Sequence, residues 1–138
     1  MRGLKIFDTE VIISDTIERQ VRGFRRALIY DDEIATGSTV LKLSEKLVQF
    51  GIEDISVICT HGIFTTDALP NLHKVPQIRE IVTTDTVPIT RKKRFSKLKI
   101  LSVASVFGEA IWRNMNCQPI GDLFSFSEDK ELPIDEDE

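Results

Sequence analysis

The chain has 138 residues, of which 41% are apolar and 29% are charged, the balance expected of an ordinary globular domain. Its formal net charge of −4 argues against nucleic acid as a main partner, because phosphate contacts need a basic surface. No apolar run approaches membrane-spanning length, and the first residues lack the pattern of a signal peptide. We therefore predict a cytoplasmic protein that binds neither nucleic acid nor membranes.

The N-terminal region, residues 1–26, is predicted to hold a strand or a partial hairpin, because residues 3–14 alternate loosely between apolar and polar positions. Residues 15–24 are polar and are interpreted as a connection into the next strand. A strand is predicted from Arg25 to Tyr30, where the chain meets two carboxylates. The first helix is predicted over residues 38–51, because apolar residues recur there at helical spacing and Gly51 is a natural helix end.

The second half of the chain continues the alternation of strands and helices. Residues 54–59 are nearly all apolar and β-branched, which is typical of a strand buried in a parallel sheet. Further elements are predicted at 66–73 (helix), 80–84 and 99–103 (strands) and up to Asn114 (helix, with Val106, Ala110 and Ile111 inward and Arg113 outward). Residues 118–126 are predicted to pack, and the acidic residues 127–138 to be a disordered tail.

This order of elements predicts a three-layer α/β domain over residues 27–126, with a mainly parallel sheet of four or five strands and helices on both faces. Right-handed crossovers would bring the carboxyl ends of the strands to one edge of the sheet, where open α/β folds bind ligands. A sheet of this size would leave an edge or a face uncovered, so self-association is also expected.

The first strand runs into Asp31 and Asp32, and a loop with Gly37, Ser38 and Thr39 then opens a helix. The N-terminus of a helix offers backbone N–H groups and a partial positive charge to a phosphate. Gly37 allows a close approach of the backbone, and the hydroxyls add donors. Carboxylates repel phosphate but suit sugar hydroxyls or a cation. The pattern indicates a sugar-phosphate site; the alternative is an ordinary turn with a Ser or Thr cap.

Three further segments come after strands or carry concentrated charge. Residues 60–64 are predicted to form a loop in which His61 either contacts a ligand or caps a neighbouring element, and the sequence does not separate these roles. Asp85 lies in a second loop, where capping or solvation is favoured. The basic run at residues 91–97 is interpreted as a solvated surface, with attraction of an anion as the alternative.

Several segments, in the same order and at the same spacing, resemble ribose-phosphate diphosphokinases, which carry a domain of the type I phosphoribosyltransferase superfamily. The ribose-phosphate motif is matched by Ile29-Tyr30-Asp31-Asp32 followed by Thr36-Gly37-Ser38-Thr39, and Ala35 is a departure from it. Residues 60–64, 84–88, 99–104 and 123–124 match later segments of the same enzymes. The match covers residues 28–124 and corresponds to the C-terminal domain part of the family.

The resemblance implies a phosphoribosyltransferase-like fold and binding of ribose 5-phosphate or phosphoribosyl pyrophosphate. It also implies Mg²⁺, bound with the substrate, and ATP, through another domain or a partner chain. The ribose hydroxyls would meet the two carboxylates and the 5-phosphate would meet the loop, so the implied substrate-binding residues are Asp31, Asp32, Ala35, Thr36, Gly37, Ser38 and Thr39. No catalytic residue and no protein metal ligand is assigned.

The activity of this chain is left open by the sequence, because the ATP site, the pyrophosphate loop and the catalytic basic residues of the family are not recognised in it. The leading hypothesis is the ribose 5-phosphate-binding portion of a diphosphokinase, unable to complete catalysis alone. The first alternative is a non-catalytic regulatory or associated subunit that binds a full-length relative. The second is a compact phosphoribosyltransferase acting on a base, for which neither a pyrophosphate loop nor a base pocket is found.

Overall fold

The computed structural model describes residues 21–65, 67–90 and 95–124. Two compact units are present, one up to Ser102 and one from Val103 onward, and each is described by itself. The predicted hairpin region before residue 21 and the acidic tail from residue 127 lie outside the described residues.

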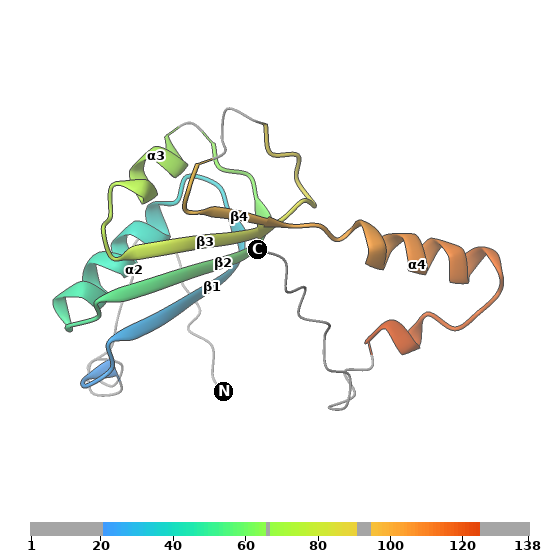
Figure 1. Ribbon diagram of the computed structural model, residues 1–138, viewed down its shortest axis with the longest axis horizontal. Coiled ribbons are helices and arrows are strands. Elements are labelled where there is room, and N and C mark those ends of the chain that lie inside the picture. Colours follow the sequence, from blue (N-terminus) through green and yellow to red (C-terminus); the bar gives the residue numbers. More distant parts are fainter. Residues whose placement is uncertain (1–20, 66, 91–94, 125–138) are drawn as a thin grey trace. The chain divides into compact units, whose positions relative to one another are not determined.

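The first unit is built on one four-stranded sheet with the order β1-β2-β3-β4 (Figure 1). All three neighbouring pairs are parallel, as expected where strands are joined by crossover connections. The prediction of a mainly parallel α/β fold is therefore confirmed. The strands are β1 (Arg26–Ile34), β2 (Asp54–Gly62), β3 (Ile78–Thr84) and β4 (Leu98–Leu101).

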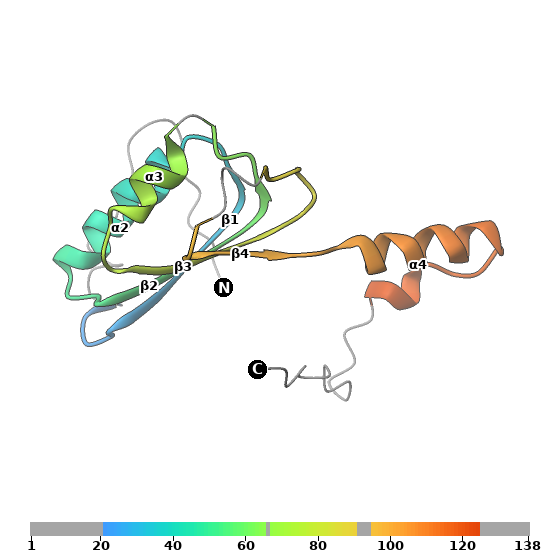
Figure 2. The same cartoon turned by 45° about the horizontal axis from the view of Figure 1, so that its top comes forward.

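Two helices, α2 (Ser38–Gln49) and α3 (Ala68–His73), lie on the same face of this sheet (Figure 2). Apolar side chains of the strands alternate toward these helices and form one core with them. The fully buried aliphatic members are Ile34, Val40, Ile55, Val57, Leu72, Ile78 and Ile81. The core thus holds the two helices against one face of the sheet.

The other face of the sheet carries Leu28 and Tyr30, whose exposed fractions are 63% and 70%. Polar side chains of three strands also contact one another here. Glu80 accepts a hydrogen bond from the Ser56 hydroxyl at 2.9 Å and another from the Lys99 ammonium at 2.9 Å. Helices on both faces were expected. Within the described residues of this unit the helices cover one face, and the second face remains open.

The strands extend further toward the ligand edge than the sequence suggests. The acidic pair was expected after the first strand, but Asp31 and Asp32 lie within β1. His61 was expected in a loop, but it lies within β2. The reason is continued pairing between the two strands, since Glu33 is in register with His61 and Ile34 with Gly62. Parallel partners satisfy these backbone groups better than a loop would.

The basic run does not act only as a solvated surface. The Lys97 ammonium donates to the carbonyl oxygens of His73 and Val75, each at 3.1 Å. The His73 carbonyl belongs to the last residue of α3, and the Val75 carbonyl follows it in the chain; cations at this end offset the negative end of a helix dipole. Lys97 therefore fixes the end of α3, whereas residues 91–94 are outside the described residues.

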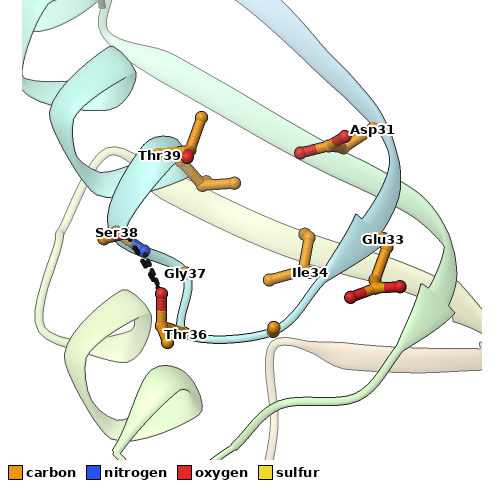
Figure 3. Close-up of a pocket in the computed structure, with 9 residues that line it drawn as sticks. Asp31, Glu33, Ile34, Thr36, Gly37, Ser38 and Thr39 are labelled. Carbon is orange, nitrogen blue, oxygen red and sulfur yellow. Dashed lines mark hydrogen bonds between the residues drawn. The ribbon is translucent and has the colours of Figure 1, made fainter. Parts of the chain in front are cut away.

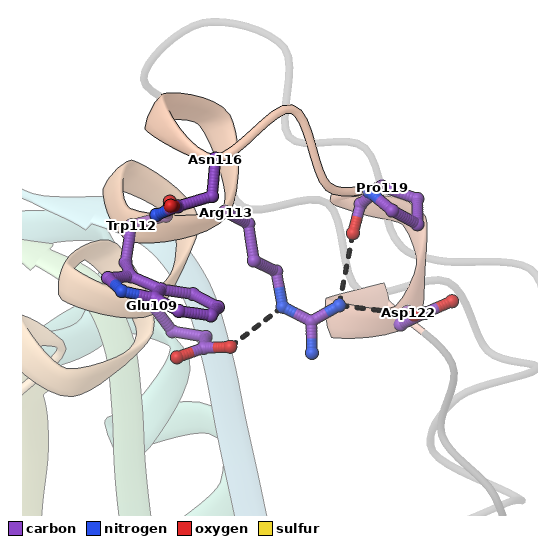
Figure 4. A network of polar contacts seen from close by, with 6 residues as sticks. All are labelled: Glu109, Trp112, Arg113, Asn116, Pro119 and Asp122. Carbon is purple, nitrogen blue, oxygen red and sulfur yellow. Dashed lines mark hydrogen bonds and ion pairs between the residues drawn. The ribbon is translucent and has the colours of Figure 1, made fainter.

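The second unit contains α4 (Ala104–Met115) and a 3-10 turn (Gly121–Phe124). Arg113 joins the two, because its guanidinium contacts Glu109 at 2.7 Å, Asp122 at 3.1 Å and the Pro119 carbonyl at 3.0 Å (Figure 4). Arg113 was expected to point outward, but these three acceptors keep its side chain 22% exposed.

The apolar residues of this unit are not packed as the sequence predicts. Val106 and Ile111 were expected to point inward but are 56% and 60% exposed, and Phe124 is 71% exposed. Helical periodicity identifies the apolar stripe of α4, but it does not identify a surface that covers the stripe.

Candidate functional site

A cavity of about 170 Å³ opens where β1 ends and α2 begins (Figure 3). It lies at the carboxyl edge of the parallel sheet, the edge that open α/β folds use for ligands. The cavity is lined by Asp31, Glu33, Ile34, Ala35, Thr36, Gly37, Ser38, Thr39 and Val40. Its size suits a small polar group better than a drug-sized ligand.

Six of the seven site residues expected from the sequence line this cavity, and the seventh, Asp32, does not. Asp32 is exposed and its main-chain N–H donates to Asp31 Oδ1 at 3.0 Å. Glu33, which the sequence argument missed, lines the cavity instead. The sequence could have indicated Glu33, because side chains two residues apart on a strand lie on the same side of it. Asp31 and Glu33 are two residues apart on β1.

The carboxylate of Asp31 points across the cavity toward the first turn of α2 (Figure 3). Partial burial raises the pKa of Asp31, the neighbouring Asp32 carboxyl raises it further, and backbone N–H groups at Asp32 and Glu33 lower it in part. The net result is a pKa above the ordinary value for an aspartate. A displaced carboxyl pKa in a cavity is a common property of functional sites.

The loop enters the helix through Gly37, which has a φ of 73° and is the N-cap residue of α2. No side chain caps this end through the N-cap position, because the N-cap residue is a glycine. The Thr36 hydroxyl lies 3.0 Å from the Ser38 hydroxyl and 3.4 Å from the Ser38 nitrogen (Figure 3). The Ser38 N–H thus has the Thr36 hydroxyl as a local acceptor, a turn bond that is compatible with both interpretations of this loop.

Two main-chain hydrogen bonds tie this loop to the segment after β2. The Phe64 N–H donates to the Ile34 carbonyl at 3.0 Å, and the Thr65 N–H donates to the Ala35 carbonyl at 2.9 Å. Phe64 is 1% exposed and has a φ of 45°, an unusual conformation for a bulky residue. Backbone strain of this kind persists only where the surrounding contacts hold it.

Glycine is required at two places beside these bonds. A Cβ atom at Gly62 would overlap the ring of Phe64 and lie 2.7 Å from Thr83 Oγ1. A Cβ atom at Gly37 would lie 3.3 Å from Leu72 Cδ1, so α3 packs directly against the loop. The position of the loop is therefore set by the core beneath it.

His61 stands on the next strand, in register with Glu33. Its Nδ1 lies 2.9 Å from the Thr86 hydroxyl, which donates to the Thr60 carbonyl at 3.0 Å. The Thr84 hydroxyl donates to the same carbonyl at 2.7 Å. The sequence left open whether His61 contacts a ligand or caps a neighbouring element. In the structure its ring is bonded to Thr86 and is not among the residues that line the cavity. Asp85 instead borders a separate hollow of about 400 Å³ with Leu98, Ile100 and Ser102.

Within residues 21–65, 67–90 and 95–124, no group of three or more His, Cys, Asp or Glu side chains could hold a metal ion. None of the helices in the same ranges is both long enough and apolar enough to cross a membrane.

Comparison with known proteins identifies the family. The profile described as the phosphoribosyl synthetase-associated domain matches residues 15–125. The chain belongs to this family. Over 117 residues, this chain is 43% identical to a Streptomyces coelicolor protein that carries a provisional ribose-phosphate pyrophosphokinase name. The match covers 85% of this chain and 36% of that protein.

Two further relatives agree with this assignment. A ribose-phosphate pyrophosphokinase of Clostridium acetobutylicum is 37% identical over 100 residues, which are 72% of this chain and 31% of the relative. The crystal structure of the Mycobacterium smegmatis phosphoribosylpyrophosphate synthetase superimposes with a TM-score of 0.66 at 32% identity, over 70% of this chain and 32% of that one. This chain thus spans about a third of the length of these proteins.

We expect the substitution Gly37→Ala to destabilise the fold more than Gly51→Ala. Both glycines have a positive φ, which costs an alanine about 1–2 kcal/mol, but the surroundings of Gly51 are open whereas those of Gly37 are tight. Urea denaturation followed by circular dichroism would measure both losses. Equal losses would contradict the contact between the loop and α3.

We expect Gly62→Ala to destabilise by about 1–3 kcal/mol or more through overpacking against Phe64. Gly108→Ala is the control, because it lies in a helix with open space around it and should be neutral or stabilising. Thermal melts of both variants would decide. A Gly62→Ala protein as stable as the wild type would show that Phe64 does not hold the loop.

We expect Asp31→Asn to stabilise the protein at pH 7. The folded state raises the pKa of Asp31, so ionisation of this group costs stability, a cost absent below the ordinary aspartate pKa and fully present above the raised one. The gain should therefore fade as the pH falls toward 3. Denaturation at several pH values would test this, and a gain that is independent of pH would contradict it.

Proposed function

We propose that this chain is the ribose 5-phosphate-binding portion of a ribose-phosphate diphosphokinase and corresponds to part of the C-terminal domain of such enzymes. The reaction of the complete enzyme would move a diphosphate from Mg-ATP to the 1-hydroxyl of the sugar, a step in nucleotide biosynthesis. The observation that carries the proposal is one cavity that joins a carboxylate strand end to a helix N-terminus. Family membership and the ordered motifs support it.

The loop would hold the 5-phosphate. Residues of the first turn of α2 line the cavity, and the hydroxyls of Thr36, Ser38 and Thr39 would add donors to the phosphate. Ala35 contributes no polar side chain, but its carbonyl is bound by Thr65, so the backbone of the loop keeps its position. Contacts from backbone groups do not depend on the identity of residue 35.

The carboxylates would hold the ribose hydroxyls. Asp31 points into the cavity, and an ionised carboxylate accepts hydrogen bonds from two neighbouring hydroxyls. Glu33 lies on the same side of the strand and can take a second position on the sugar. We assign Asp32 an indirect role here, because its N–H orients Asp31 while its side chain does not line the cavity.

We further propose that diphosphate transfer needs groups supplied by another domain or chain. Phosphoryl transfer depends on neutralising the charge of the phosphates, and none of the described residues that line the cavity is basic. Mg²⁺, which the family resemblance implies, would enter bound to the substrate.

Calorimetric titration of ribose 5-phosphate tests the site directly. We expect Asp31→Asn to weaken binding by roughly 10- to 100-fold, since hydrogen bonds to a charged group contribute about 1.5–3 kcal/mol. Asp32→Asn should have a smaller effect. Ser56→Ala is the control, because this side chain lies on the open face of the sheet and binds Glu80. Ribose without its phosphate should bind far more weakly.

An absence of binding to the wild type, or one affinity shared by all variants, would contradict the sugar-phosphate site. A separate assay with Mg-ATP and ribose 5-phosphate tests the incompleteness of the chain. Formation of phosphoribosyl pyrophosphate and AMP by this chain alone would overturn that part of the proposal while leaving the binding site intact.

A second candidate function is that of a subunit that associates with a longer relative. The observation that favours it is the open sheet face with its exposed Leu28 and Tyr30. Co-sedimentation with a full-length diphosphokinase would support this candidate if Tyr30→Lys abolished it. No association of the wild-type chain at micromolar concentration would count against it.

A further inference from the structure

The cavity at the end of β1 has two chemically different sides (Figure 3). The loop side carries the hydroxyls of Thr36, Ser38 and Thr39, which can donate hydrogen bonds. The strand side carries the carboxylates of Asp31 and Glu33, and an ionised carboxylate can only accept them. A ligand that bridges the cavity therefore needs acceptors at its loop end and donors at its strand end.

The negative strand side is a consequence of how β1 is built. Asp31 and Glu33 stand two residues apart on this strand, so their side chains lie on the same side of it. Pairing with β2 continues past both positions, which fixes the backbone that carries them. None of the described residues that line the cavity is a lysine, an arginine or a histidine. The two carboxylates thus act together on whatever reaches the strand side.

Asp31 already shows what this environment does to a negative charge. Burial raises the pKa of its carboxyl, the neighbouring Asp32 carboxyl raises it further, and backbone N–H groups at Asp32 and Glu33 lower it in part. The ionised form of Asp31 is therefore disfavoured before any anionic ligand is added. Glu33 is exposed, so its carboxylate keeps contact with water while it borders the cavity.

A second phosphate group on the sugar would be opposed twice at the strand side. Ionised phosphate oxygens accept hydrogen bonds, so they have nothing to offer carboxylates that also accept. Their negative charge is in addition repelled by each carboxylate. A sugar hydroxyl at the same place donates a hydrogen bond instead. Replacing that hydroxyl by a phosphate turns a favourable contact into an unfavourable one.

We propose that Glu33 is a specificity-determining residue, which makes the cavity select sugar monophosphates with free hydroxyls over sugars that carry a second phosphate at the strand side. The inference rests on the proposed function and deepens it, because it names the class of ligand that the cavity excludes. The product of the proposed diphosphate transfer carries its added phosphates on a sugar hydroxyl. Glu33 therefore weakens binding of the product relative to that of the substrate.

Calorimetric titrations with ribose 5-phosphate and ribose 1,5-bisphosphate test this role, in a buffer that contains a chelator and no divalent cation. The measured quantity is the ratio of the two dissociation constants. We expect the wild type to bind the monophosphate more tightly. Glu33→Gln should reduce this preference by roughly 10-fold, because it removes the repulsion between a carboxylate and the second phosphate. The ratio compares two ligands on one protein, so a partial loss of folded protein does not change it.

Two further variants separate the charge of Glu33 from other effects. Glu33→Asp keeps the charge and should keep most of the preference. Glu45→Gln removes the same charge from an exposed position on α2 that does not line the cavity, and it should leave the ratio unchanged. Added salt should shrink the preference of the wild type more than that of Glu33→Gln, since salt screens exposed charges.

Equal affinities of the wild type for the two ligands, or one ratio shared by wild type and Glu33→Gln, would overturn this inference while ribose 5-phosphate binding persists. An equal loss of preference in Glu45→Gln would assign the effect to net charge and would also overturn the role of Glu33. An absence of ribose 5-phosphate binding to the wild type would instead overturn the proposed function, and this inference with it.

Discussion

Two main-chain hydrogen bonds hold the candidate site in place, from Phe64 to Ile34 and from Thr65 to Ala35. They join the end of β1 to the chain leaving β2, and they fix the point at which the loop turns toward α2. Gly62 leaves room for the Phe64 ring, and Gly37 leaves room for α3. These contacts fix the position of the loop whose residues line the cavity.

The proposed function follows from what this scaffold brings together. A helix N-terminus suits a phosphate, and a strand end with Asp31 suits sugar hydroxyls, so one small cavity offers both halves of a sugar phosphate their natural partners. The pKa of the Asp31 carboxyl in this cavity is raised, and none of the described lining residues is basic. On the proposed function, a binding site of this composition needs positive charge from outside the loop, which the substrate cation would supply.

Much of this arrangement could be predicted from the sequence, because its causes are local. Apolar periodicity located α2, the β-branched run located β2, and the acidic pair with the Gly37 loop located the cavity. Strand ends were predicted too short, because pairing between neighbours decides where a strand stops. The placement of Glu33 in the cavity instead of Asp32 depends on strand alternation, which a motif does not encode. The exposure of α4 depends on a covering surface that no sequence period specifies.

The most direct test of the sugar-phosphate site is a ribose 5-phosphate titration followed residue by residue in two-dimensional amide NMR spectra. The account predicts that the largest shifts fall on the N–H groups of Thr36, Ser38 and Thr39, with smaller shifts at Asp31 and Glu33. Shifts concentrated at the hollow beside Asp85 and Ile100, or no shifts at all, would contradict it.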